Sequence, residues 1–171
     1  MPLLRLALAL LLLASPATAQ KVDPPVAAPD GLEFFEGTDP TMNAAILEAQ
    51  RSLPGFLTEV LDENGIAQTG SLKVAFQTFP EDLGNEIIWV GNFRQLPDGS
   101  FEGFLNNQPF NLGNWSQGDR VTFPRGAIRD WSLPAPEGLY GNFTTRVIAA
   151  QPGNEYLWQS LTSNPIPANW P

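Results

Sequence analysis

Apolar residues at helical spacing follow a strong helix start near residue 39. Asp39-Pro40 places Asp at an N-cap and Pro at the first helical position. The apolar stripe that follows has the spacing i, i+4, i+7 and i+11, at Met42, Ile46, Ala49 and Leu53. We expect Pro54 to end or kink this helix, because its ring clashes with the preceding turn. A short second helical piece is then expected over residues 56–61.

Beyond residue 70 the apolar period changes from helical to two. Leu72, Val74 and Phe76 alternate with polar or small neighbours, as in a strand with one buried face. A tight turn is expected over residues 97–100. Further strands are expected over residues 86–94, 101–106, 120–123, 128–133 and 139–148. This order predicts an α+β domain in which an N-terminal helix packs on a curved, mainly antiparallel β-sheet.

The first 19 residues have the layout of a cleavable signal peptide. Arg5 precedes an apolar run over residues 6–14, and Ala17 and Ala19 supply the small-x-small cleavage pattern. A membrane-spanning helix needs about 20 apolar residues, and this run is much shorter. We therefore expect cleavage near Ala19, a periplasmic or secreted protein, and no membrane span in the mature chain.

The remaining chain divides into three parts. Residues 20–38 contain several prolines and are expected to form an extended leader, with residues 32–35 able to dock on the core. The α+β domain is expected over residues 39–150. Residues 151–171 form a proline-rich tail that we expect to be partly docked through the apolar residues 156–158.

Charge and missing residue types exclude several functions. The chain has 9 basic and 18 acidic residues, and losing Arg5 with the signal peptide leaves 8 against 18, a net charge of −10. Such a surface repels phosphate backbones and anionic lipid headgroups, so nucleic acid is an unsuitable partner. There is no His and no Cys. This excludes Ser-His-Asp catalysis, thiol nucleophiles, disulfides and metal sites built from these residues. We expect no cofactor and no metal.

Two local patterns resemble functional sites but lack residues that those sites need. Lys73 is the only lysine of the predicted fold, so a Ser-Lys dyad would have to use it, but no S-x-x-K pattern lies near it. Residues 62–73 fit a calcium loop at Asp62 and Asn64. However, Ala67 stands where the loop needs Gly, and Lys73 stands where it needs Glu. A plain surface turn is expected there.

Two carboxylates next to predicted strands could carry chemistry. Asp119 and Asp130 would act as an acid and base pair on a sugar if their carboxyl groups lay roughly 5 to 9 Å apart. The sequence gives no distance between them, and turn formation also explains an Asp beside Gly. A hydrolase that uses Asp119 and Asp130 is therefore one alternative function.

Several polar and aromatic residues near predicted strand ends form a candidate binding surface. Loops at such positions present side chains from a rigid scaffold. Arg146 could hold a carboxylate through two parallel hydrogen bonds. The two tryptophans of the set could instead be core residues. The candidate binding residues are Trp89, Asn107, Asp119, Asp130, Trp131 and Arg146.

Short motifs in a fixed order give the chain a family resemblance. They are Met42 to Ile46, Leu53-Pro54-x-Phe56, Leu72 to Val74, Ile88 to Val90, Asp98-Gly99-x-Phe101-x-Gly103, Leu105 to Pro109, Gly118-Asp119-x-Val121, Ile128-x-Asp130-Trp131 and Gly141-x-x-Thr144-Thr145-Arg146. Together they resemble the YegJ-like family, the domain of unknown function 2314. The family pattern usually shows a His just before the strand Trp, where this chain has Ile87. The resemblance implies a small α+β domain with no established activity, and some related small domains look like immunity or inhibitor proteins.

These observations favour a non-enzymatic exported domain that binds a protein or a small ligand. The alternatives are the carboxylate hydrolase described above, an immunity-like or inhibitor-like protein, and a purely structural envelope protein. A binding function is favoured because the usual catalytic side chains are missing while Trp, Asn, Asp and Arg recur near strand ends.

Overall fold

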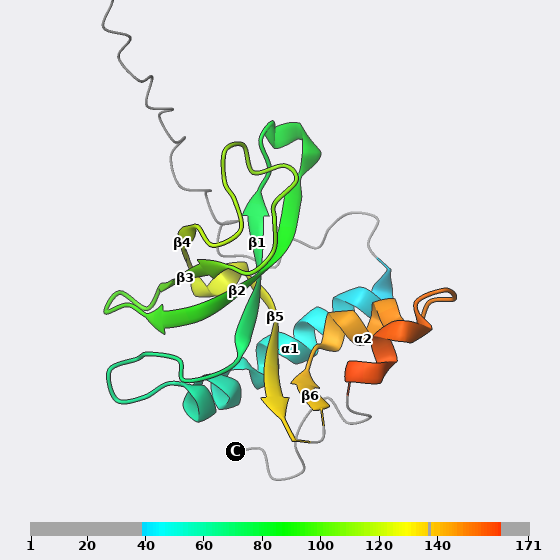
Figure 1. Cartoon of the computed structure of the whole chain (residues 1–171), viewed down its shortest axis with the longest axis horizontal. Helices are drawn as coiled ribbons and strands as arrows, with labels where there is room; N and C mark the ends of the chain where they lie inside the picture. The colour runs from blue at the N-terminus through cyan, green and yellow to red at the C-terminus, as the bar shows by residue number, and fades with distance from the viewer. Residues whose placement is uncertain (1–38, 137, 162–171) are drawn as a thin grey trace, which may run out of the picture.

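The computed structural model describes residues 39–136 and 138–161. The predicted signal peptide, the predicted leader and residues 162–171 lie outside this part. The elements in chain order are α1 Pro40–Val60, β1 Ser71–Gln77, η1 Glu81–Leu83, β2 Asn85–Gln95, β3 Phe101–Leu105, β4 Arg120–Phe123, η2 Arg125–Ala127, β5 Ile128–Ala135, β6 Gly138–Gly141, α2 Phe143–Ala149 and η3 Glu155–Ser160 (Figure 1).

The six strands form one open sheet in the order β4-β3-β2-β1-β5-β6, and every neighbouring pair is antiparallel. Helix α1 packs on this sheet and α2 lies beside α1 (Figure 1). The predicted α+β class, with an N-terminal helix on an antiparallel sheet, is confirmed. No helix among residues 39–136 and 138–161 is long and apolar enough to cross a membrane.

Helix α1 begins as predicted but does not break at Pro54. The Asp39 carboxylate accepts a hydrogen bond of 2.8 Å from the Thr41 amide, which is the expected N-cap contact. The helix then runs without interruption to Val60, so the expected two-piece helix is wrong. Pro54 lies on the exposed side, while Leu53 and Phe56 on either side of it are buried. Their burial outweighs the one helical hydrogen bond that Pro54 cannot donate.

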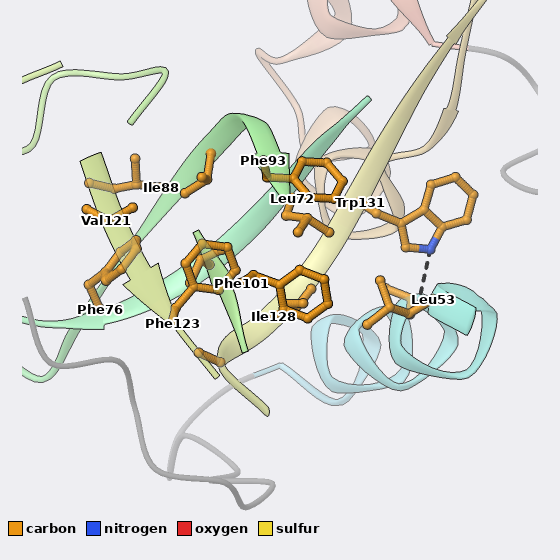
Figure 2. Packing of buried hydrophobic residues seen from close by; sticks show 14 of the residues in the cluster. Leu53, Leu72, Phe76, Ile88, Phe93, Phe101, Val121, Phe123, Ile128 and Trp131 are labelled. Atoms are coloured by element: carbon orange, nitrogen blue, oxygen red, sulfur yellow. Dashed lines mark hydrogen bonds between the residues drawn. The ribbon is translucent and has the colours of Figure 1, made fainter. Parts of the chain in front are cut away.

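The core fills one face of the sheet, and Trp131 joins it to α1. The Trp131 ring stacks on Phe56 at 4.9 Å between centroids and meets the edge of Phe143. Its indole nitrogen donates to the Ala49 carbonyl at 3.2 Å and to the Ser52 hydroxyl at 3.0 Å. Figure 2 shows the indole directed at α1, apart from the core aromatic side chains of the other strands. Buried aromatic rings with a satisfied polar end of this kind contribute strongly to stability.

Most predicted strands are confirmed, and the last one is half wrong. Residues 139–148 were expected to form one strand, but β6 ends at Gly141 and α2 begins at Phe143. Gly141 and Asn142 both have positive φ, 72° and 56°, which turns the chain between the two elements. Gly adopts this conformation without strain, and Asn is among the residues that tolerate it.

The tail residues described by the structure form η3, which packs beside α2. The Tyr156 and Trp158 side chains are exposed. Leu161 makes an isolated parallel bridge with Leu139 at the edge of the sheet. The tail therefore touches the domain mainly through α2 and β6.

Candidate functional site

A groove opens where the start of α1, helix α2 and the face of the sheet opposite the core meet. Its volume is about 420 Å³, within the usual range for small-molecule sites. Its residues are Met42, Ile46, Lys73, Asn85, Ile87, Arg129, Thr144 and Ile148. Four of these side chains are aliphatic or thioether groups and two are cationic. We refer to this hollow as the groove.

Strand register places the polar part of the groove. Lys73 on β1 lies opposite Trp89 on β2 and opposite Asp130 on β5. Since directly paired residues share a face of the sheet, these three side chains belong to the face that lines the groove. Ile87 lies one alternation from Trp89 and joins the same face.

A β-bulge at Arg129 lets β5 place Ile128 and Trp131 on the core face of the sheet and Asp130 on the opposite face. Lys73 pairs with Asp130, but the next residue of β1, Val74, pairs with Ile128, so Arg129 is the extra residue. Ile128 and Trp131 are three positions apart and would lie on opposite faces of a regular strand. With the bulge, both are buried in the core while Asp130 turns to the other face. Arg129 is itself buried and lines the groove.

The Asp130 carboxylate anchors α2 to the sheet. It is fully buried. One oxygen accepts from the amides of Trp131 at 2.8 Å and Phe143 at 3.2 Å. The other accepts from the Thr144 amide at 2.8 Å and the Thr144 hydroxyl at 2.6 Å. Four donors directed at two oxygens suit an ionised carboxylate, which only accepts hydrogen bonds.

Lys73 completes this network from β1. Its ammonium donates to the Thr144 hydroxyl at 2.9 Å and lies 5.4 Å from the centre of the Trp89 ring. Burial lowers the pKa of Lys73, and the nearby Asp130 charge opposes that change. Burial raises the pKa of Asp130, while its hydrogen bonds with Thr144 and the Lys73 charge oppose the rise. Each charge thus makes the burial of the other less costly.

The network positions Lys73 at the groove. The Thr144 hydroxyl donates to Asp130 and accepts from Lys73, so both of its hydrogen bonds lie within the network. An ammonium has three N–H donors. Within the described part of the chain, Lys73 makes one hydrogen bond with them. Lys73 can therefore donate to a ligand in the groove without breaking its bond to Thr144.

Three of the predicted binding residues have structural roles at or near the core. Trp131 is fully buried and cannot face a ligand from the surface. Asp130 is fully buried behind Thr144 and Lys73, so it acts on the groove through them. Arg146 donates to the backbone carbonyls of Gly141 at 3.1 Å and Leu139 at 3.0 Å, which ties α2 to β6. The two parallel bonds expected of Arg146 thus go to backbone in this structure.

The other three lie elsewhere on the sheet. Trp89 is half-buried beneath Lys73, and its amide donates to the Asn107 side-chain oxygen at 3.3 Å. Asp119 accepts from the Ser116 amide at 3.0 Å in the turn before β4. Asn107 and Asp119 therefore stabilise the loop that joins β3 to β4.

The structure does not bring Asp119 and Asp130 together. Asp119 precedes β4 and Asp130 lies in β5, with β3, β2 and β1 between them. Four strand spacings of 4.8 Å make about 19 Å across the sheet. A pair of glycosidase carboxyls needs a separation about half as large. The acid–base pair considered from the sequence therefore does not form.

Sequence reasoning missed the residues that line the groove. From the sequence, Lys73 is a possible dyad base and the cation that excludes the calcium loop, although a lone lysine amid a strand of apolar residues signals a special position. Thr144 lies in a motif that carries the family resemblance, and Ile87 stands where the resembled family usually has His. Met42 and Ile46 belong to a motif of the resemblance, but their meeting with Ile148 depends on how α1 and α2 pack.

The calcium-loop pattern is a turn, as expected. One oxygen of Asp62 accepts from the amides of Asn64 and Ile66, both at 2.9 Å. This is the hydrogen bonding of a side-chain-capped turn. No group of three or more acidic residues capable of holding a metal occurs among the residues that the structure describes.

One known family covers most of the described chain. The family described as an uncharacterised protein conserved in bacteria, domain of unknown function 2314, matches residues 39–160. The match begins at the N-cap of α1 and ends in η3, so it spans the helices and the whole sheet. No curated protein and no solved structure matches the chain. The chain belongs to the bacterial family of domain of unknown function 2314.

Proposed function

We propose that this chain is an exported, non-enzymatic binding module that holds a small ligand in the groove. The observation that carries the proposal is the pairing of two cationic side chains, Lys73 and Arg129, with an otherwise mainly aliphatic lining. Ligand sites commonly combine an apolar wall with a few placed polar groups. The Asp130 network holds Lys73 and α2 in place, so the groove is preformed.

Export is the second part of the proposal and comes from the sequence. It is supported by Arg5, the apolar run over residues 6–14 and the small residues before position 20. Cell fractionation of the full chain with a C-terminal tag tests export. A protein of the mass of residues 20–171 in the periplasm or medium is expected, and a full-length cytoplasmic protein would contradict it.

Ligand binding is testable by thermal unfolding of residues 20–171 against a panel of small anions, cations and neutral compounds. Ile46→Trp should fill the groove, whereas Leu47→Trp places the same bulk on the next residue, which is exposed and outside the groove. At least one compound should raise the Tm of the wild type and of Leu47→Trp but not of Ile46→Trp. Equal shifts in both variants, or no shift with any compound, would refute the proposal.

A second candidate, protein binding, is favoured by an exposed apolar patch. Phe79, Leu83 and Phe110 are 65%, 57% and 90% exposed. Phe79 and the loop that carries Phe110 are joined by an amide-to-carbonyl bond of 2.6 Å between Phe79 and Asn111, at the β1–β2 end of the sheet (Figure 1). Clustered exposed apolar side chains commonly mark protein contacts. This reading would include an immunity-like or inhibitor-like role.

Crosslinking in a periplasmic extract tests the protein-binding candidate. The bait is residues 20–171, with Phe110→Ser as the variant and Tyr156→Ser as an exposed aromatic control far along the chain. A partner crosslinked near Phe110, kept by Tyr156→Ser and lost by Phe110→Ser, would support this function. A partner retained by Phe110→Ser would show that the patch is not the surface that binds it.

A further inference from the structure

We propose that the groove ligand is an aliphatic monocarboxylate, with its carboxylate bound by Lys73 and its chain lying between α1, α2 and β2. This inference rests on the proposed small-ligand function and names the chemical class that the groove accepts. It depends on three features: the lining that would meet the ligand's body, the fixed position of the ammonium, and the local balance of charge.

The lining selects an aliphatic body. Met42 and Ile46 from α1, Ile87 from β2 and Ile148 from α2 supply the apolar walls. None of the described residues that line the groove is aromatic. Branched and thioether side chains pack well against a flexible hydrocarbon chain, and its removal from water drives binding.

The ammonium of Lys73 is held where a carboxylate can reach it. The Thr144 hydroxyl fixes one of its donors at 2.9 Å, and the Trp89 ring lies 5.4 Å from it. A partly buried lysine that is oriented before binding loses little side-chain freedom on contact with an anion. Hydrogen bonds between ammonium and carboxylate are stronger than those between neutral groups, especially where water is partly excluded.

Local charge favours an anion. Lys73 and Arg129 line the groove, and Asp130 behind them lies within electrostatic reach of Lys73 and of Arg146. Positive side chains therefore outnumber the one carboxylate here, in a chain whose net charge is −9. A phosphate dianion costs more to remove from water than a monocarboxylate, so the mainly aliphatic walls favour the monocarboxylate. Asp130 and Thr144 are positioning residues in this arrangement, because they hold Lys73 and do not contact the ligand's carboxylate directly.

Calorimetric titration of residues 20–171 with octanoate, octanamide and acetate tests the class. Octanamide keeps the chain length and removes the charge, and acetate keeps the carboxylate and removes the chain. Octanoate should bind at least about tenfold more tightly than octanamide, because the charge-assisted contact is lost in the amide. Acetate should bind too weakly to measure. Equal affinity for octanoate and octanamide, or no octanoate binding, would overturn the proposal.

Variants then assign the contact to Lys73. Lys73→Met keeps the unbranched side chain and removes the charge. Arg120→Met is the matched control, since Arg120 also lies over an aromatic ring of the same sheet, 5.9 Å from Phe104, but outside the groove. Lys73→Met should lose the preference for octanoate over octanamide, and Arg120→Met should keep it. A preference that survives in Lys73→Met overturns the assignment, and the wild-type comparison of the two ligands does not depend on how the variant folds.

The two proposals fail in different ways. A different compound that binds the wild type and is lost in Ile46→Trp, while octanoate does not bind, would overturn the carboxylate class and keep the groove as a ligand site. Octanoate binding that persists in Ile46→Trp would overturn both, because the ligand would then lie elsewhere.

Discussion

Replacing Asp130 with Asn should destabilise the domain by about 3 to 4 kcal/mol, although the two side chains have nearly the same shape. The carboxylate accepts four hydrogen bonds, two at each oxygen. Asn can keep the two at one oxygen. At the other it presents an NH₂ group to the Thr144 amide, which leaves a buried N–H without an acceptor and costs about 1–3 kcal/mol.

The charge adds to this cost. Lys73 would lose its buried counter-charge, and removing one partner of a buried pair costs roughly 3–5 kcal/mol when the other stays charged. Lys73 reduces that penalty by releasing its proton more easily, since burial already lowers its pKa. The two costs overlap, so the expected total of about 3 to 4 kcal/mol is smaller than their sum. For a domain of this size the change corresponds to a fall in Tm of roughly 10–15 °C.

Urea unfolding followed by tryptophan fluorescence and by circular dichroism measures the loss. Asp98→Asn is the control, because the Asp98 carboxylate also accepts a backbone hydrogen bond, from Ser100, but in an exposed turn. The unfolding midpoint of the control should stay close to the wild type. A loss below about 1 kcal/mol in Asp130→Asn would show that the carboxylate does not anchor α2, and the argument for a preformed groove would fail with it.

Three further outcomes follow from the same contacts. Thr144→Val keeps the side-chain shape and removes the hydroxyl between Asp130 and Lys73, so urea unfolding should show a loss of about 1–2 kcal/mol; no loss would contradict the network. The stability of the wild type relative to Lys73→Met should rise as pH increases toward 10.5, the ordinary lysine pKa, because burial lowers the pKa of Lys73 and the folded chain therefore releases this proton at a lower pH than the unfolded chain. A flat difference in urea unfolding as the pH approaches that value would refute the burial of Lys73. Gly141→Ala should abolish folding or lower the Tm severely, since a Cβ there would lie 2.3 Å from the Trp131 carbonyl oxygen. Gly99→Ala is the control, because Gly99 also has positive φ but has open space around it, and this change should cost only about 1–2 kcal/mol. Similar melting curves for the two variants would show that crowding at Gly141 does not affect stability.

Local patterns in the sequence predicted most of the fold because they report on single elements. Asp39-Pro40 marks a helix start through the capping of free amides, and the structure has the helix begin there. Alternation at Leu72, Val74 and Phe76 reports one buried face of a strand, and these side chains lie in the core. Turn residues separate the strands at nearly the observed positions.

Two errors occurred where distant residues outweigh local preference. Pro54 ends a helix in isolation, yet α1 continues because Leu53 and Phe56 are both buried against the sheet. Residues 143–148 contain several β-formers, yet they form α2 because the Asp130 carboxylate accepts hydrogen bonds from the first amides of that helix. Asp130 is 13 residues before Phe143, so no short window of sequence contains the interaction.

The candidate site depends still more on tertiary structure. The sequence by itself determined the residue types on hand: no His, no Cys, and one lysine within the fold. Only the antiparallel register placed Lys73 opposite Asp130, and only the bulge at Arg129 turned Asp130 away from the core while Trp131 and Ile128 stayed in it. The groove walls come from α1, β2 and α2, which meet through packing. The sequence determines the chemistry of each side chain. The distances between side chains that make a site depend on how the strands pair and how the helices pack on them.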